Sequence, residues 1–265
     1  MRKTAIIVPC YNEAQRLNMR AFIQAASEDR SLFFIFVNDG STDRTLETIK
    51  RLHDALPDQI SYVDLQKNSG KAEAVRQGFL AAFSSDFANI GYWDADLATP
   101  LASIRTFRGL LDTSKTSLVI GSRVKLLGRR IERRPLRHYL GRLFATAASL
   151  ILRLPVYDTQ CGAKIFKNSG NLRKVFGNPF TVSWIFDVEI LARFLIIERQ
   201  TYGDGAGSDW VEYPLEQWRD ITGSKLGWGS FLSSGIDLLK LAAFLYVPFF
   251  KGRYAALLLS DHYHE

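Results

Sequence analysis

The sequence has few cysteines and no long hydrophobic run. Two cysteines among 265 residues cannot form a framework of several disulfides, and they favour a reducing compartment. The longest apolar run, residues 241–250, contains Pro248 and is shorter than the ~18–20 residues of a membrane-spanning helix. The apolar stretch at residues 5–8 is too short for a signal peptide. These absences predict a cytoplasmic protein without a transmembrane segment.

The chain also lacks a glycine-rich dinucleotide turn after its first predicted strand. Residues 9–13 read Pro-Cys-Tyr-Asn-Glu where a dehydrogenase would carry Gly-x-Gly-x-x-Gly, which disfavours that class of enzyme. Apolar residues make up 47% and charged residues 23% of the chain, an ordinary globular composition. Because no repeat, low-complexity tract or Pro/Gly linker divides the sequence, we expect one compact unit over residues 1–265.

Positive charge is concentrated in one stretch of the chain. The net charge is +7, and residues 123–142 contain a single acid, Glu132. The basic residues of this stretch are Arg123, Lys125, Arg129, Arg130, Arg133, Arg134, Arg137 and Arg142. Arginine dominates, and its planar guanidinium suits phosphate. The stretch is either an ordinary solvated face or a site for a diphosphate, an anionic membrane surface or nucleic acid.

Strand-like and helix-like segments alternate in the first half of the chain. Strands rich in β-branched and aromatic residues are expected at residues 5–8, 32–38, 60–65, 89–93 and 117–120. Helices with apolar stripes are expected at residues 13–27, 43–55, 70–83 and 101–111, the second capped by Ser41-Thr42-Asp43. This alternation predicts an α/β fold, a Rossmann-like doubly wound and mostly parallel sheet with helices on both faces.

The second half predicts longer helices. They are expected at residues 135–154, 187–197 and 231–245, with a strand at residues 210–218. The first helix mixes arginines with leucines and aromatics, so it either lies at a membrane interface or packs on the core with a wet basic face. The apolar segment 241–250 is likewise expected to dip into an interface, to join the core or to pair two copies in a homo-oligomer.

The fourth predicted strand leads directly into two carboxylates, Asp94 and Asp96. Side chains at i and i+2 of a strand share a face, so both would converge beyond the sheet edge if extended geometry persists. Crevices at that edge bind ligands in α/β sheets. Oxygen ligands suit Mg²⁺ or Mn²⁺, which commonly contact substrate phosphates as well. The alternative is an acidic turn before Pro100.

Three other strand ends carry polar or glycine residues to the same edge. The first strand is followed by Tyr11 and Glu13, the second ends near Asp39, and the third leads into Gly70 and Lys71. A helix that begins at a glycine beside a lysine is a natural anion site. Ordinary turns and caps could explain each end alone, but they explain four consecutive ends poorly.

The ordered motifs resemble those of family 2 glycosyltransferases of the GT-A fold. The early motifs are Val-Pro-Cys-Tyr-Asn-Glu at 8–13, Asn-Asp-Gly-Ser-Thr-Asp at 38–43, Asn-Ser-Gly-Lys at 68–71 and Asp-Ala-Asp at 94–96. The later motifs are Gly-Ser-Arg at 121–123, Asp-Thr-Gln-Cys-Gly-Ala-Lys at 158–164, Trp-Ile-Phe-Asp-Val-Glu at 184–189 and Gly-Ser-Lys-Leu at 223–226. The later set is narrower and is most similar to dolichyl-phosphate or polyprenyl-phosphate β-glucosyltransferases.

The resemblance implies an inverting enzyme that moves a hexose, expected to be glucose from UDP-glucose, to a polyprenyl phosphate. Residues 1–122 would bind the nucleotide sugar and residues 123–265 the acceptor. The implied substrate contacts are Pro9, Tyr11, Glu13, Asp39, Lys71, Asp94, Arg134, Gln160, Ser224 and Lys225. Asp96, with Asp94, would hold Mg²⁺ or Mn²⁺ against the diphosphate, and Arg123 would embrace that diphosphate.

The need for a general base depends on the acceptor. A phosphate with a second pKa of about 6 is already largely anionic at neutral pH, so its attack needs little proton removal. A sugar hydroxyl would need a base, and Asp187 and Glu189 are the candidates, unless both merely form a polar first turn of their helix. One departure from related mannosyltransferases is Ala98, where those enzymes carry a polar residue that can help to bind the metal.

Three functional hypotheses follow. The favoured one is a peripheral enzyme on the inner face of the membrane, with a nucleotide sugar, a polyprenyl phosphate and an anionic membrane surface as partners and no nucleic acid. The second is a soluble family 2 enzyme that glycosylates a saccharide hydroxyl. The third is a non-catalytic module whose basic stretch binds membrane or nucleic acid, with salt-dependent affinity and no need for the carboxylate pair.

Overall fold

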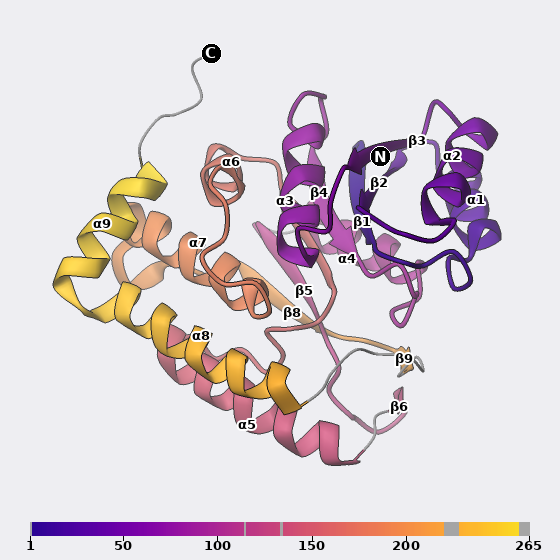
Figure 1. Cartoon of the computed structure of the whole chain (residues 1–265). Coiled ribbons are helices and arrows are strands. Elements are labelled where there is room, and N and C mark those ends of the chain that lie inside the picture. Colours follow the sequence, from indigo (N-terminus) through magenta and orange to yellow (C-terminus); the bar gives the residue numbers. More distant parts are fainter. Residues whose placement is uncertain (1, 114, 133–134, 220–227, 260–265) are drawn as a thin grey trace.

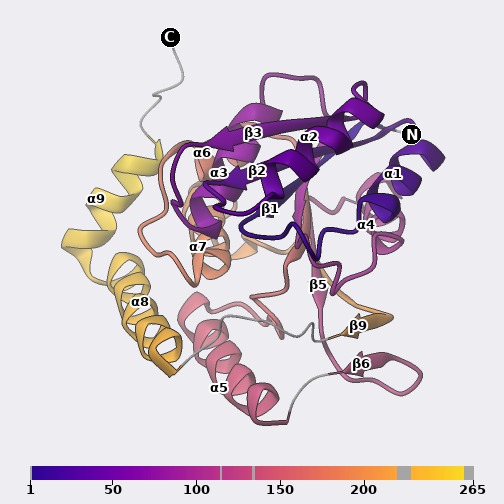
Figure 2. The ribbon, with the colours of Figure 1, turned by 45° about the vertical axis from the view of Figure 1, so that its right-hand side comes forward.

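The computed structural model describes residues 2–113, 115–132, 135–219 and 228–259. Within these residues a seven-stranded sheet has the strand order β3-β2-β1-β4-β7-β5-β8. Its strands are β1 (Thr4–Cys10), β2 (Leu32–Asp39), β3 (Ile60–Leu65), β4 (Asn89–Trp93), β5 (Leu118–Ser122), β7 (Ala163–Lys167) and β8 (Trp210–Pro214). Helices cover both faces of this sheet (Figures 1 and 2), which confirms the predicted α/β class.

The sheet is parallel except at one strand. β1 pairs in parallel with β2 and β4, β2 pairs in parallel with β3, and β5 pairs in parallel with β8. β7 runs antiparallel between β4 and β5, with Trp93 opposite Ala163. A smaller sheet pairs β6 (Arg130–Glu132) with β9 (Gln217–Arg219). The carboxyl ends of β1, β2, β4 and β5 and the start of β7 therefore lie at one edge.

The helices divide between two hydrophobic layers because strand side chains alternate. Ile6 and Val8 of β1 pack with α1 (Met19–Glu28), α2 (Thr45–Ala55) and α4 (Ser103–Thr113). Ile7 faces the opposite layer. The helices of that layer are α3 (Lys71–Ala82), α5 (Pro135–Leu152), α6 (Gly170–Gly177), α7 (Phe186–Tyr202), α8 (Trp228–Tyr246) and α9 (Pro248–Leu259). A 3-10 turn, η1 (Gly203–Gly205), follows α7.

The first helix begins later than the sequence predicted. α1 starts at Met19, not at residue 13, because Asn18 caps it by accepting the N–H of Ala21. Asn12 has a φ of 53°, a left-handed conformation that turns the chain away from the helical path. The N–H of Leu17 closes a local turn on the carbonyl of Glu13. Polar turn chemistry therefore overrides the apolar spacing of residues 13–18.

Other boundaries differ because of turns and long-range pairing. The segment 210–218 is not one strand, because the chain leaves β8 at Pro214 and pairs again as β9 with β6. α2 starts at Thr45, and Asp43 accepts the N–H and hydroxyl of Thr45 ahead of the helix. α5 ends at Leu152, where Arg153 has a φ of 52°. The sequence analysis did not predict β6, β7, α6 or α9.

Among the described residues, one bent pair of helices has the length and hydropathy of a membrane span. No single helix in the described part of the chain is both long and apolar enough to cross a membrane. Residues 233–246 of α8 and 248–258 of α9 meet the length and hydropathy requirement only together, and they meet at 88°. Both cysteines, Cys10 and Cys161, are buried and free.

Candidate active site

The carboxylate pair follows β4 at the carboxyl edge of the sheet. The chain turns directly after Trp93, and Leu97 adopts a φ of 55°. The N–H of Leu97 donates to the carbonyl of Asp94 at 3.2 Å, and the N–H of Ala98 donates to Asp96 Oδ1 at 3.0 Å. The extended geometry assumed from the sequence therefore does not persist through the pair. A tight turn sets the direction of the two carboxylates.

Asp96 carries an electrostatic penalty at this edge. Burial raises its pKa above the ordinary value, and the neighbouring charge of Asp94 raises it further. The N–H of Ala98 and the charge of Lys71 act in the opposite direction without cancelling the rise. Two adjacent carboxylates of this kind are less costly beside a cation.

The chemistry of these donors fits a divalent cation of the Mg²⁺ or Mn²⁺ type, which takes carboxylate and phosphate oxygens. Asp94 and Asp96 would supply the protein ligands. In the described ranges no group of three or more His, Cys, Asp or Glu side chains gathers to form a closed metal site. Substrate and water oxygens would therefore complete the coordination, and Ala98 adds no side-chain ligand.

Lys71 neutralises part of this charge. It is the first residue of α3, and its Nζ lies 2.5 Å from Asp94 Oδ1. Burial acts to lower the pKa of Lys71, but the charge of Asp94 and then that of Asp187 outweigh burial and raise it. Lys71 is therefore a firmly protonated cation at the helix N-terminus, where anions also bind favourably.

Asp39 fixes the loop that leads into α3. Its carboxylate accepts the N–H of Ser69 at 2.7 Å and the N–H of Gly70 at 2.9 Å. The next residue, Gly40, has a φ of 59°, and a Cβ there would lie 2.3 Å from the carbonyl carbon of Lys67. The end of β2 is thus held against the start of α3. The predicted place of Asp39 in a nucleotide pocket stays a prediction.

The ends of β1 and β2 are joined by short polar contacts. The N–H of Thr42 donates to the side chain of Asn12 at 2.9 Å, and the N–H of Glu13 donates to Thr45 Oγ1 at 2.7 Å. The carboxylate of Glu13 pairs with Arg16 at 2.5 Å. These contacts bring the segment that contains Pro9, Tyr11 and Glu13 beside the segment after Asp39, as the predicted nucleotide pocket requires.

A close backbone contact joins β7 to the carboxylate pair. The N–H of Asp94 donates to the carbonyl of Gly162 at 3.0 Å. A Cβ at Gly162 would lie 1.9 Å from Asp94 Oδ2, so a larger residue would displace this carboxylate. Glycine in the Asp-Thr-Gln-Cys-Gly-Ala-Lys motif therefore makes room for Asp94.

Asp187 lies in a buried cluster with two residues that the sequence analysis did not single out. Lys164 is fully buried, and its Nζ lies 2.5 Å from Asp187 Oδ1. The hydroxyl of Tyr92 donates to the same oxygen, and Tyr92 and Lys164 face each other across β4 and β7. Burial and then the charge of Asp187 raise the pKa of Tyr92 well above its ordinary value. The only sequence signal for Lys164 was its place at the end of a recognised motif.

Glu189 has a different environment. It is fully buried and accepts the N–H groups of Thr181 and Val182. Its Oε1 lies 2.7 Å from Arg193 Nη2 and accepts the hydroxyl of Tyr254 at 2.6 Å. Both oxygens are thus engaged, and Glu189 ties α7 to α9. This geometry gives no support to its predicted role as a base.

Arg123 also has a protein partner. Its Nε and Nη2 donate to the two carboxylate oxygens of Asp158 at 2.6 and 2.7 Å, and its own N–H adds a third bond. Burial acts against the charged guanidinium, but the charge of Asp158 outweighs burial and raises the pKa of Arg123. Arg123 therefore anchors the loop before β7. A contact with diphosphate would have to share or replace this pair.

The remaining predicted residues fall in two groups. Gln160 lines a small pocket between α5 and the loop before β7, together with Arg142, Tyr157 and Thr159. Arg134, Ser224 and Lys225 lie outside the described residues.

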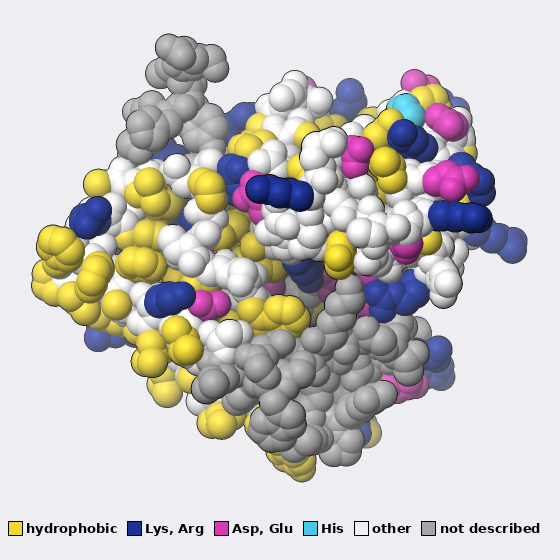
Figure 3. Space-filling view, viewed as in Figure 1, with side chains coloured by type: hydrophobic (Ala, Val, Ile, Leu, Met, Phe, Trp, Pro, Cys, Tyr) yellow, Lys and Arg dark blue, Asp and Glu magenta, His cyan; other side chains and the backbone are white. Residues whose placement is uncertain are grey.

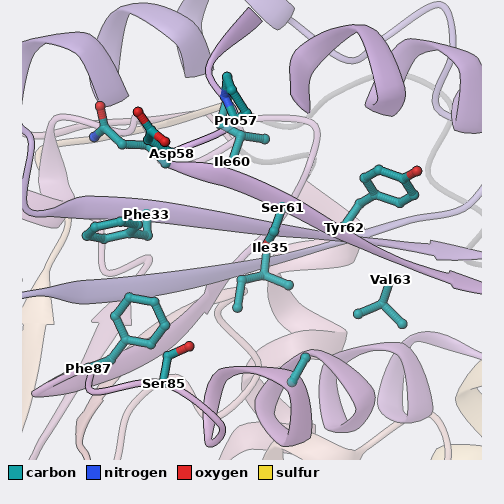
Figure 4. Close-up of a pocket in the computed structure, with 12 residues that line it drawn as sticks. Phe33, Ile35, Pro57, Asp58, Ile60, Ser61, Tyr62, Val63, Ser85 and Phe87 are labelled. Atoms are coloured by element: carbon teal, nitrogen blue, oxygen red, sulfur yellow. The ribbon is translucent and has the colours of Figure 1, made fainter. Parts of the chain in front are cut away.

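A larger pocket lies elsewhere. Figure 4 shows it beside the edge strand β3, with Phe33 and Phe87 on one side and Tyr62 on the other. Its lining includes residues 57–59, which precede β3, so it opens near the start of that strand and not at the carboxyl edge. None of the residues predicted for the site lines it. The candidate site is therefore identified by converging charges and not by the larger cavity.

Comparisons with known proteins agree with the motifs. Residues 5–178 match the family described as Glycosyl transferase family 2. A dolichyl-phosphate beta-glucosyltransferase of Trichomonas vaginalis is 30% identical over 254 residues, which cover 91% of this chain and 71% of that protein. Dolichyl-phosphate beta-glucosyltransferase of Saccharomyces cerevisiae is 30% identical, and the alignment covers 90% of this chain and 71% of that protein. The enzyme of the same name from Homo sapiens is also 30% identical, and the alignment covers 90% of this chain and 74% of that protein.

Solved structures support the fold. Glucosyl-3-phosphoglycerate synthase from Mycobacterium tuberculosis in complex with UDP aligns with a TM-score of 0.61 at 20% identity, covering 91% of this chain and 80% of that one. The same enzyme in complex with Mn²⁺, UDP-glucose and phosphoglyceric acid gives a TM-score of 0.61, also at 20% identity, with the same coverage of both chains. At this identity the likeness supports the shared fold alone.

Proposed function

The chain belongs to glycosyl transferase family 2, and we propose that it transfers glucose from UDP-glucose to the phosphate of a dolichyl or other polyprenyl phosphate. The relatives at 30% identity are named dolichyl-phosphate beta-glucosyltransferases, which supports the transfer of glucose and the dolichyl phosphate acceptor. The observation that carries the proposal is the meeting of Asp94, Asp96 and Lys71 at the carboxyl edge of the sheet.

The donor would lie along the ends of β1, β2 and β4. Pro9, Tyr11, Glu13 and Asp39 would border the base and ribose, and Lys71 would lie beside the diphosphate. Asp96, with Asp94, would hold Mg²⁺ or Mn²⁺ there. A bound divalent ion neutralises negative charge on a departing diphosphate. The joined ends of β1 and β2 and the loop fixed by Asp39 would keep these groups in place before the donor binds.

The reaction is a single displacement with inversion. An oxygen of the acceptor phosphate attacks the anomeric carbon, while the bond from that carbon to the UDP oxygen breaks and its electron pair leaves with UDP. Because the phosphate is already largely anionic at pH 7, no proton has to be removed from it. The cluster around Asp187 is consistent with this, since Lys164 and Tyr92 already donate to one of its oxygens.

Asp187 would then position charge instead of removing a proton. Its charge contributes to the raised pKa of Lys71, so it helps to keep that lysine protonated beside Asp94. The acceptor would approach over the loop before β7 and α5, where Gln160 and Arg123 lie. The enzyme would act as a peripheral protein on the cytoplasmic face of a membrane, because a polyprenyl chain resides in the bilayer.

The test is product formation. The protein is incubated with Mn²⁺, UDP-glucose and polyprenyl phosphate, and the lipid fraction is examined for glucosyl phospholipid. We expect product with the native protein and a loss of about 10²–10³-fold in Asp96→Ala, the size expected when a preorganised electrostatic contact to the transition state is removed. Asp112→Ala, an exposed acid of α4, is the matched control. Equal product from Asp96→Ala would reject the role of this carboxylate, and turnover only on saccharide hydroxyls would reject the lipid acceptor.

A further inference from the structure

The exposed large apolar side chains are gathered in the C-terminal half of the molecule. Among the described residues, no exposed large apolar side chain precedes Leu126 in the sequence. Most belong to α5, to α8 and α9, or to Val247, which joins those two helices. These are Tyr139, Leu143, Leu150, Ile236, Leu239, Tyr246, Val247, Phe249, Phe250 and Leu257. Figure 3 shows hydrophobic side chains massed on the side of the molecule where α8 and α9 lie in Figure 1.

The corner between α8 and α9 is the most prominent part of this surface. We define the corner as residues 246–253. Tyr246, Val247, Phe249 and Phe250 are 41%, 42%, 64% and 43% exposed. The helices meet at 88°, and both ribbon views place the junction at the outer margin, away from the sheet (Figures 1 and 2). Apolar side chains on a sharp, projecting bend can enter the boundary between lipid headgroups and acyl chains without crossing the bilayer.

Basic residues surround the corner. Residues 233–258 contain three cations, Lys240, Lys251 and Arg253, all exposed, and one acid, Asp237, which is largely buried and pairs with Lys240 at 3.3 Å. Directly after α5, the guanidinium of Arg153 lies over the ring of Tyr246, 5.0 Å from its centroid. Basic residues beside aromatic and aliphatic ones complement an anionic lipid surface. A symmetric contact with a second copy would instead bring like charges together.

The corner is held firmly to the helix that carries Asp187. On α9, Tyr254 and Leu258 are buried, and the hydroxyl of Tyr254 donates to Glu189 of α7 at 2.6 Å. Asp187 lies in the first turn of that same helix. At the other end of the corner, the hydroxyl of Tyr246 donates to the carbonyl of Ile151 in α5. The corner therefore has a fixed position relative to the candidate active site.

We propose that the α8–α9 corner is a membrane-docking wedge, whose exposed aromatic and aliphatic side chains enter the interface of an anionic bilayer while Lys251 and Arg253 contact lipid phosphates. The inference deepens the proposed function, because it names the surface that brings the site to a lipid acceptor. Docking itself needs neither donor nor acceptor. It can therefore succeed or fail independently of the reaction.

The test is vesicle co-sedimentation of the full chain without sugar nucleotide or polyprenyl phosphate. Vesicles of phosphatidylcholine are compared with vesicles that also contain phosphatidylglycerol. We expect binding to the anionic vesicles, reduced at least roughly tenfold in Phe249→Ser/Phe250→Ser, because two large apolar side chains no longer enter the interface. Lys251→Gln/Arg253→Gln should lose mainly the preference for anionic lipid and the sensitivity to salt.

The matched control is Leu127→Ser, which removes a fully exposed leucine in the loop between β5 and β6. It should bind vesicles like the native protein. All variants change exposed side chains, so an unchanged thermal midpoint checks that each is folded. Binding equal in the phenylalanine variant and the native protein would overturn the proposal, as would no binding by either. Light scattering that finds a native dimer and a monomeric phenylalanine variant, with unchanged vesicle binding, would assign the corner to a second copy.

Discussion

Two carboxylate clusters, one around Glu189 and one formed by Asp94 and Asp96, differ in how completely protein groups satisfy their oxygens. Glu189 is fully buried and accepts from two backbone N–H groups, a guanidinium and a phenol. Asp96 is partly buried beside Asp94, and its pKa is raised. The oxygens of Glu189 already accept hydrogen bonds from protein donors. A bound cation would instead lower the electrostatic cost of holding Asp94 and Asp96 side by side. The comparison teaches that a crowded acidic residue is structural when its donors come from the protein, and a candidate ligand when they do not.

Removing Glu189 from its cluster should give the largest loss of folding stability. Glu189→Ala leaves Arg193 buried without its carboxylate, and removal of one partner of a buried pair costs about 3–5 kcal/mol. Urea unfolding followed by circular dichroism measures this loss. Glu216→Ala is the control, because Glu216 is largely exposed and pairs with Arg129 at 3.2 Å, so its loss should cost less than about 1 kcal/mol. Equal losses in the two variants would remove the contrast between the clusters.

Lys71→Met removes the ion pair that Lys71 forms with Asp94 in the cluster of Asp94 and Asp96. Because the Lys71–Asp94 pair is partly exposed, we expect a stability change below about 1 kcal/mol. Donor binding should weaken by about tenfold, or 1.4 kcal/mol, since a cation beside the diphosphate is lost. Titration with UDP followed by calorimetry gives the affinity. Lys67→Met changes an exposed lysine of the preceding loop and should leave it unchanged. Unaltered UDP affinity in Lys71→Met would place the diphosphate elsewhere.

The smallest effect is the pH dependence of stability that comes from Asp96. Its pKa is higher in the folded protein, so the folded state holds the proton more tightly than the unfolded chain does. This contribution is present below the unfolded value of about 3.9 and is lost as the pH rises through the raised folded pKa. In a chelator, Asp96→Asn should therefore be more stable than the native protein at neutral pH, and this advantage should shrink in acid. Thermal midpoints across pH measure it. If the stability advantage of Asp96→Asn grew in acid, the pKa of Asp96 would be lowered by folding and not raised.

Much of the fold followed from local patterns, but some elements depend on distant partners. β1 to β4 were predicted because each is a β-branched or aromatic run followed by a helix, which is a strong local signal. β7 was not predicted, because Lys164 and Lys167 interrupt its apolar pattern. The buried charge of Lys164 is balanced by the carboxylate of Asp187, 23 residues further along the chain. Spacing within one segment does not carry that information.

The site was predicted to a similar extent. The sequence placed Asp94, Asp96 and Lys71 at one edge, and the structure brings them together. It also named Arg123 and Glu189, but it did not reveal their partners, Asp158 and Tyr254, which lie 35 and 65 positions away. Those partners give both residues a structural contact, while the predicted roles, a diphosphate contact for Arg123 and a base for Glu189, stay predictions. Side-chain burial and pairing across such distances arise from packing and have no local signature.

The reversed direction of β7 has a consequence for how the two halves of the chain cooperate. In a wholly parallel sheet every strand starts at the edge opposite the ligands, so only the segments after strands reach the crevice. Here one strand begins where β4 and β5 finish, and the segment in front of it, from Asp158 to Gly162, reaches the same edge, where the N–H of Asp94 donates to the carbonyl of Gly162. The segment before β7 thereby lies beside the end of β4 at one edge of the sheet.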